Sequence, residues 1–185
     1  MINKAKTTYR GSHGISLRAA TDQDFAVLAR LRNDRLVQDS LLAIAKPNSS
    51  ARVRAWIERR AGDDAGVFFV IADALDGPAI GFIQASGVDH LHRIAELGIC
   101  LDVTRRGKGY GRQAIALFEK YLIQVLNVRK LWLRVASSNT SAIALYRSSG
   151  FKNVGTLKKH HFVNGRFCDV LLMEKLLPKT KTSRE

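Results

Sequence analysis

Residues 105–118 read RRGKGYGRQAIALF, with three glycines at alternate positions among basic residues just before an apolar-periodic run. Glycine adopts backbone conformations that other residues avoid, and it brings the main chain close to a ligand without a Cβ in the way. The N–H groups in the first turn of a helix have no partner within the helix, and the helix dipole favours negative charge there. A basic, glycine-rich turn that opens a helix is therefore typical of an anion site, here one suited to a diphosphate.

Other interpretations of this stretch must be weighed. A dinucleotide-binding G-x-G-x-x-G motif counted from Gly107 would need a glycine where Arg112 stands, and the preceding strands do not form a βαβ unit. A P-loop needs G-x-x-x-x-G-K-[ST], which the chain lacks. The remaining alternative is a helix start that uses its glycines only to turn, and the stretch by itself leaves this alternative as open as a phosphate site.

The order of elements predicts an α+β fold. Apolar alternation and helical periodicity indicate strand, helix, helix, three strands, helix, strand, helix and two strands. The expected strands cover 15–20, 66–73, 79–88, 93–103 and 130–137, the expected helices cover 25–37, 50–61, the run that follows the glycines and 139–150, and a hairpin turns at Asn164-Gly165. We expect one domain over 14–177 between flexible basic tails, 1–13 and 178–185.

The charge is the unusual part of the composition. The chain of 185 residues carries a formal net charge of +14. The tails contribute five of these charges, so the body keeps +9. Such a balance favours an anionic ligand without choosing among nucleotide, phosphorylated cofactor, RNA or acidic protein.

No window approaches the roughly 20 apolar residues of a membrane span, and the N-terminus lacks the apolar core of a secretory signal. We therefore expect a cytoplasmic protein without membrane contact.

Two motifs together resemble the GCN5-related N-acetyltransferase (GNAT) superfamily. The first is the R-G-K-G-Y-G of 106–111, and the second is N-T-S-A-I-A-L-Y of 139–146 with Gly150-Phe151. The resemblance covers roughly 15–177. It implies a mixed, mostly antiparallel sheet of six to seven strands with about four flanking helices. The fourth and fifth strands of that sheet splay apart, and acetyl-CoA enters between them as the acetyl donor.

The resemblance also implies which residues contact the cofactor. The pyrophosphate would lie on the main-chain amides of 106–111, the pantetheine arm would pair with the strand near Ile99, Leu101 and Val103, and Asn139 would hydrogen-bond the arm. The full expected cofactor-binding set is Ile99, Leu101, Val103, Arg105, Arg106, Gly107, Lys108, Gly109, Tyr110, Gly111, Arg112, Asn139 and Tyr146.

Acetyl transfer to an amine needs a base for the amine, a donor for the thioester oxygen and an acid for the leaving thiolate. On residue type alone, Tyr146 is a helix-face aromatic that packs with Phe151, whereas the resemblance implies that it is the general acid. A backbone N–H of 99–103 is the expected oxyanion donor. Glu96 is either the base, acting through water, or a salt-bridged strand residue. Relatives that acetylate ribosomal-protein N-termini carry a glutamate at the position of Arg134, and this departure disfavours that substrate class.

The acceptor is the least constrained part. Segments of the chain resemble polyamine acetyltransferases and enzymes that acetylate nucleotide-linked amino sugars. Because the expected helices 25–37 and 50–61 are rich in arginine, we rank an anionic amine such as an amino-sugar nucleotide first and a polyamine second. A protein amine remains open as the acceptor, and so does a non-catalytic nucleic-acid-binding module, although no RNA-binding motif is present.

Neither the histidine pairs nor Cys100 and Cys168 have metal-ligand spacing, so no metal site or disulfide is expected. A homodimer is possible.

Overall fold

The computed structural model describes residues 8–10, 14–74 and 77–178. Its helices are α1 (Phe25–Asn33), α2 (Arg35–Ser40), α3 (Ser50–Ala61), α4 (Tyr110–Leu126) and α5 (Thr140–Ser148), with short 3₁₀ turns η1 (Asp22–Asp24) and η2 (Val103–Arg105). Its strands are β1 (Tyr9–Arg10), β2 (Ile15–Arg18), β3 (Val67–Asp73), β4 (Ala79–Asp89), β5 (Ile94–Leu101), β6 (Lys130–Ala136), β7 (Lys152–Val163) and β8 (Arg166–Leu176). None of the helices in these ranges has the length and apolarity needed to cross a membrane.

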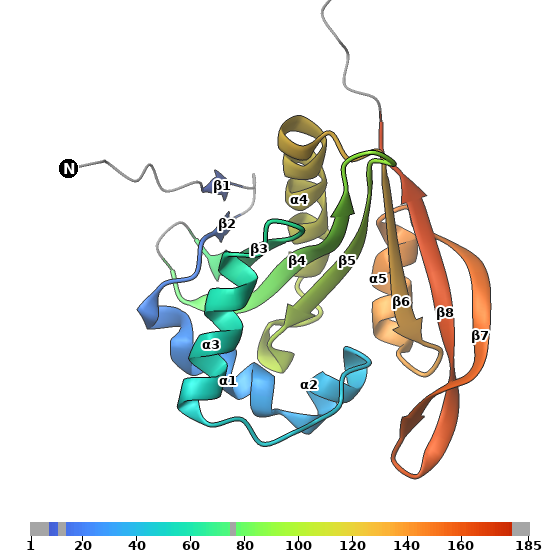
Figure 1. The fold of residues 1–185 in the computed structure, drawn as a ribbon, viewed down its shortest axis with the longest axis horizontal. Coiled ribbons are helices and arrows are strands. Elements are labelled where there is room, and N and C mark those ends of the chain that lie inside the picture. Colours follow the sequence, from blue (N-terminus) through green and yellow to red (C-terminus); the bar gives the residue numbers. More distant parts are fainter. Residues whose placement is uncertain (1–7, 11–13, 75–76, 179–185) are drawn as a thin grey trace, which may run out of the picture.

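The described strands form one sheet in the order β1-β2-β3-β4-β5-β6-β8-β7 (Figure 1). Every neighbouring pair is antiparallel except β5–β6, which confirms the expected α+β class and the mixed, mostly antiparallel sheet. The sheet has eight strands rather than six to seven because β1 extends it. The β1 residues Tyr9 and Arg10 pair with β2, and the Tyr9 ring packs 5.1 Å from that of Tyr121, so this part of the predicted 1–13 tail is a strand. The rest of that tail and residues 179–185 lie outside the described residues.

Strands β5 and β6 separate soon after they meet. Their parallel pairing covers only Ile94–Lys130, Ala95–Leu131 and Glu96–Trp132. Beyond Glu96, β5 pairs only with β4, while β6 pairs with β8 along its whole length, so the two strands diverge (Figure 1). The expected splay of the fourth and fifth predicted strands is confirmed here.

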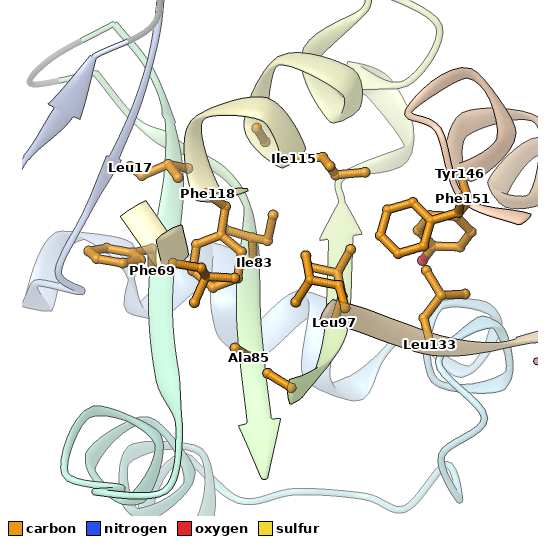
Figure 2. Close-up of a cluster of buried hydrophobic side chains, with 14 of the residues drawn as sticks. Leu17, Phe69, Ile83, Ala85, Leu97, Ile115, Phe118, Leu133, Tyr146 and Phe151 are labelled. Atoms are coloured by element: carbon orange, nitrogen blue, oxygen red, sulfur yellow. The ribbon is translucent and has the colours of Figure 1, made fainter. Parts of the chain in front are cut away.

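Both faces of the sheet are covered, because apolar side chains of a central strand point alternately to one face and to the other. In β3, Phe69 and Ile71 belong to the cluster under α4, whereas Phe68 and Val70 belong to the cluster under α1 and α3. Figure 2 shows the first cluster, in which Phe118 of α4 packs against Phe69 of the sheet and Ile115 of α4 lies on the side of Leu97. Each such side chain, once buried, stabilises the fold by about 1.5–3 kcal/mol, so the sheet is held as a rigid support for the splay.

Two local features refine the sequence-based elements. The helix predicted over 25–37 is broken into α1 and α2, because Asp34 leaves the helical conformation and its side chain accepts a hydrogen bond from the Val37 N–H, 3.1 Å away. The predicted hairpin is confirmed. Asn164 and Gly165 both have positive φ, 51° and 75°, as a tight two-residue turn between β7 and β8 requires.

Candidate active site

A cavity of about 910 Å³ opens where β5 and β6 diverge. This volume lies within the roughly 300–1,000 Å³ that is usual for small-molecule sites. It is lined by the turn between β5 and α4 and by α5, and residues of α1, α2 and α3 line it as well. The residues predicted for the site that line this cavity are Glu96, Ile99, Leu101, Arg105, Arg106, Gly107, Gly109, Tyr110, Gly111, Arg112, Asn139 and Tyr146.

The glycine-rich turn presents its main chain to this cavity. Gly107 and Gly109 have positive φ, 74° and 78°, and α4 begins immediately afterwards. Within the described part of the chain, the N–H groups from Gly107 to Arg112 donate to no protein acceptor, whereas the Arg106 N–H already reaches the Val103 carbonyl at 3.3 Å. Gly111 has a packing role as well, because a Cβ there would lie 3.0 Å from Cδ2 of Leu145 on α5. The turn thus offers a row of unpaired donors at a helix start, as an anion requires.

The basic side chains of the turn are not equally available to a ligand. Arg105 is ion-paired with Asp73 at 2.7 Å, and Nε of Arg106 donates to the Leu101 carbonyl at 3.1 Å. Arg112 borders the cavity, whereas Lys108 does not. The main chain, more than these side chains, therefore supplies the directed contacts of the turn.

The turn is fixed by a buried carboxylate that was not singled out from the sequence. Asp102 is only 4% exposed, and it accepts hydrogen bonds from the N–H and hydroxyl of Thr104 and an ion pair from Arg30. Burial alone would raise the pKa of Asp102, but the hydrogen bonds from Thr104 and Arg30 hold it below its usual value. The D-x-T spacing of an Asx turn is the signal that would have identified this carboxylate.

Val103 was expected to continue strand β5 and is instead the first residue of η2. Its side chain is 66% exposed and does not border the cavity. The chain turns at this point because Asp102 caps η2 and stops the strand at Leu101. The expectation that this strand continues to residue 103 was therefore wrong, and the open edge of β5 ends near Ile99 and Leu101.

Tyr146 packs in the core and also borders the cavity. Its ring lies 5.8 Å from that of Phe151 in an edge-to-face contact, as Figure 2 shows, and the residue is 7% exposed. It also borders the cavity from α5. Burial raises the pKa of the phenol to about 12, and the nearby Cys100 contributes in the same direction. The phenol therefore keeps its proton throughout the neutral pH range and faces the cavity as a hydrogen-bond donor.

Asn139, by contrast, uses one of its amide atoms within the protein. Its Oδ1 accepts from the Ala142 N–H and from the Ser141 hydroxyl, both at 3.2 Å, and so caps α5. Only its Nδ2 is left for the ligand contact that was expected.

Glu96 forms an ion pair across the splay. Its carboxylate lies 2.9 Å from Nε of Arg134 on β6, and both residues line the cavity. Glu96 is the only acidic residue among the described residues that line it. The salt-bridged arrangement considered from the sequence is therefore present, and it holds a carboxylate next to the cavity.

Comparison with known proteins identifies the family that has this architecture. The model of the Acetyltransferase (GNAT) domain family matches residues 17–172. The chain belongs to the GNAT family. It is accordingly an acetyltransferase, and the expected acetyl donor, acetyl-CoA, is confirmed with the family.

The relatives of this GNAT chain include enzymes named for a polyamine. The spermidine N(1)-acetyltransferase of Vibrio cholerae serotype O1 is 31% identical over 159 residues, covering 86% of this chain and 91% of that protein. A crystal structure of the Vibrio cholerae spermidine N-acetyltransferase with CoA and spermine superposes with a TM-score of 0.82 at 30% identity, over 89% of this chain and 96% of that chain. A dodecameric structure of the Vibrio cholerae enzyme in an intermediate state has a TM-score of 0.76 at 30% identity, over 93% and 99% of the two chains.

The GNAT cavity is also lined by residues of the arginine-rich helices that were predicted over 25–37 and 50–61. Arg32, Trp56 and Arg60 line it from α1 and α3, and Gln38 lines it from α2. The predicted charge of these helices thus reaches the cavity wall.

The histidines and cysteines do not contribute to the cavity in the same way. No histidine of the described residues lines it, and Cys100 lies in its wall with a free, buried thiol. Within the described ranges, no group of three or more His, Cys, Asp or Glu side chains is placed to hold a metal ion.

Proposed function

We propose that this GNAT enzyme transfers the acetyl group of acetyl-CoA to a primary amine of a small molecule, and that the first acceptor class to test is a polyamine. The proposal rests on one observation above all: unpaired N–H groups at the start of α4 open onto the same cavity as Tyr146 and Glu96. The names of the relatives support the polyamine. This order reverses the ranking drawn from charge alone, which put an amino-sugar nucleotide first.

The residues of the cavity fit the donor from end to end. The N–H groups from Gly107 to Arg112 would hold the pyrophosphate, and the edge of β5 that β6 leaves unpaired would accept the amides of the pantetheine arm as an added strand does. A main-chain N–H near Ile99 or Leu101 would then donate to the thioester oxygen as negative charge develops on it.

The proton transfers are assigned to two side chains. Glu96 would take a proton from the acceptor ammonium, directly or through water, while Arg134 holds its carboxylate in place. Tyr146 would donate its phenolic hydrogen to the sulfur as the C–S bond breaks, and the raised pKa keeps that hydrogen present at neutral pH.

A second acceptor class is favoured by the wall of the cavity. The arginines that line it are Arg32, Arg60, Arg105, Arg106, Arg112 and Arg134, against Glu96 as the single acid of the described lining. The positive charges of these arginines repel a polycation. An amine that also carries an anionic group therefore fits this wall better than a bare polyamine does.

A thiol-release assay with acetyl-CoA and a panel of acceptors tests both classes. The panel pairs spermidine and spermine with amines that bear a carboxylate or a phosphate, and it includes peptides and aminoglycosides. The proposal expects release with spermidine at micromolar to millimolar KM. Faster turnover with the anionic amines would select the second class, and no release with any acceptor would contradict the acetyl-transfer proposal for small amines.

We further propose that the chain assembles into a homo-oligomer, which the dodecameric structure of the Vibrio cholerae enzyme supports. Light scattering coupled to size-exclusion chromatography measures the mass directly. A mass equal to one chain of 20.5 kDa at all concentrations would contradict this.

A further inference from the structure

A second, smaller hollow adjoins the part of the active-site cavity that α1 and α3 line. It has a volume of about 300 Å³ and is lined by Arg32, Asn48, Arg52, Trp56, Arg59, Arg60 and Asp63. We call it the arginine pocket, after Arg32, Arg52, Arg59 and Arg60. It shares Arg32, Trp56 and Arg60 with the larger cavity, so the two are adjacent.

The arginines of this pocket lack acidic partners. Elsewhere in the described chain several arginines are ion-paired, among them Arg30 with Asp102 and Arg54 with Asp22. Within the same described residues, none of the four pocket arginines makes a salt bridge. Asp63 is the one acid in the described lining, and its Oδ1 is engaged by the Ala65 N–H at 3.0 Å.

One of the four guanidinium groups is already oriented. Nη1 of Arg32 donates to Gln38 Oε1 at 2.6 Å, and the buried Gln38 is itself held by the Leu31 carbonyl. The guanidinium of Arg32 also lies 5.6 Å from the centre of the Trp56 ring. Its Nε is buried and has no hydrogen-bond partner. A buried donor without a partner is costly, typically about 1–3 kcal/mol, unless a ligand satisfies it.

The repulsion among the four pocket arginines also favours binding of an anion. Burial lowers the pKa of Arg32, and the positive charges of Arg60, Arg52 and Arg59 lower it further. Three of the arginines lie on one stripe of α3, at positions 52, 59 and 60, on the same side as Trp56. A bound anion would neutralise this repulsion and accept hydrogen bonds from several planar guanidinium forks at once.

We propose that the arginine pocket binds an oxyanion, the phosphate or carboxylate group of a small molecule, beside the part of the active-site cavity that α1 and α3 line. This goes beyond the acetyl transfer proposed above, and it can be tested without any turnover. The oxyanion has two possible sources, a free anion or an acidic group of the acceptor itself.

Isothermal titration calorimetry with inorganic phosphate, at constant ionic strength, tests the site. The titration is made on protein saturated with CoA, because the N–H groups at the start of α4 would otherwise also bind phosphate. Wild type is expected to bind one phosphate per chain, and Arg52→Gln/Arg59→Gln is expected to bind it at least tenfold more weakly. Neither residue lines the larger cavity.

The charge-matched control is Arg35→Gln/Arg54→Gln. It removes two arginines that line neither hollow, one of them from the same helix α3, and it is expected to bind phosphate as wild type does. An equal loss in both double variants would overturn the proposal, since it would show an effect of net charge alone. The absence of saturable binding to wild type would overturn it as well. If Arg52→Gln/Arg59→Gln does not fold, the single variants replace it, each expected to weaken binding at least threefold, and unchanged affinity in both singles overturns the site.

Inhibition of acetyl transfer by phosphate distinguishes the sources. Competition with the acceptor, lost in Arg52→Gln/Arg59→Gln, would support an acidic group on the acceptor. Inhibition or activation that is not competitive, and is likewise lost in that variant, would support a separate anion. A failure of the acetyl-transfer assay would leave the calorimetric result intact, so the two proposals fail independently.

Discussion

At the scale of single residues, Tyr146 is both a core side chain and a wall of the active site. Its phenol has to stay neutral to donate a proton, and burial provides for that by raising the pKa to about 12. We expect Tyr146→Phe to lower kcat by at least about 10²-fold, because the hydrogen that the proposed mechanism gives to the sulfur is lost while the ring contact with Phe151 remains. Steady-state kinetics should show KM for acetyl-CoA near wild type.

The matched control for this change is Tyr121→Phe, which removes a phenol from the same core but outside the cavity. It should leave kcat unchanged. Wild-type turnover in Tyr146→Phe would mean that Tyr146 only packs, as its contact with Phe151 alone would suggest.

The proposed role of Glu96 as a base leads to a prediction about the pH dependence of activity. A base is needed only while the acceptor is an ammonium ion, whose pKa in free alkylamines resembles the roughly 10.4 of lysine. We therefore expect Glu96→Gln to lower kcat/KM about 10²-fold at pH 7, and we expect the deficit to shrink as the pH approaches 10. A pH–rate profile of both enzymes measures this.

Glu174→Gln is the control for this prediction, because Glu174 is also ion-paired on the sheet, with Lys130, but does not line the cavity. Its profile should follow wild type. A deficit of Glu96→Gln that stays constant across the pH range would assign Glu96 a positioning role through Arg134 instead of proton transfer.

At the scale of elements, the start of α4 depends on backbone conformation. Gly109 has a φ of 78°, a region that costs other residues about 1–2 kcal/mol and β-branched ones more. Gly109→Val should therefore turn the following N–H groups away from the cavity and raise the Kd for CoA about tenfold or more, measured by calorimetry. Gly109→Asn should lose much less, because asparagine tolerates this region. Equal affinities for all three proteins would argue against the pyrophosphate assignment.

The elements also show how far sequence reasoning reached. The glycine turn and the hairpin at Asn164-Gly165 were predictable because each depends on neighbours in the chain. The end of β5 before Val103 and the break at Asp34 were missed, since a side chain competes there with the continuing backbone pattern.

Contacts between distant segments could not be predicted from the sequence for a different reason. The Glu96–Arg134 pair, 38 residues apart in the chain, and the gathering of Arg32 with the arginines of α3 depend on how the sheet and its covering helices pack. The sequence indicated each residue type and the positive charge of the helices, but it could not show which charges find partners.

At the scale of the whole molecule, stability should fall in alkaline solution for a specific reason. Burial raises the pKa of the Cys100 thiol from 9.0 to about 12, and it raises that of Tyr146 from 10.0 to about 12. Above pH 9 the unfolded chain releases these protons while the folded chain keeps them. The folded state then binds more protons, so the free energy of unfolding decreases as the pH rises from about 9 to about 12.

Urea unfolding at pH 8, 9, 10 and 11 measures this slope. Cys100→Ala should flatten it between pH 9 and 11, because each unit of pKa difference is worth about 1.4 kcal/mol, whatever the variant's stability at pH 8. Cys168→Ala is the control, since it removes the second free thiol, which is only partly buried and does not line the cavity. Lysines also lose charge in this range, but they do so equally in both variants, so the difference between the two slopes isolates Cys100. Identical slopes would show that the thiol beside Tyr146 ionises as readily in the folded protein as in the unfolded chain.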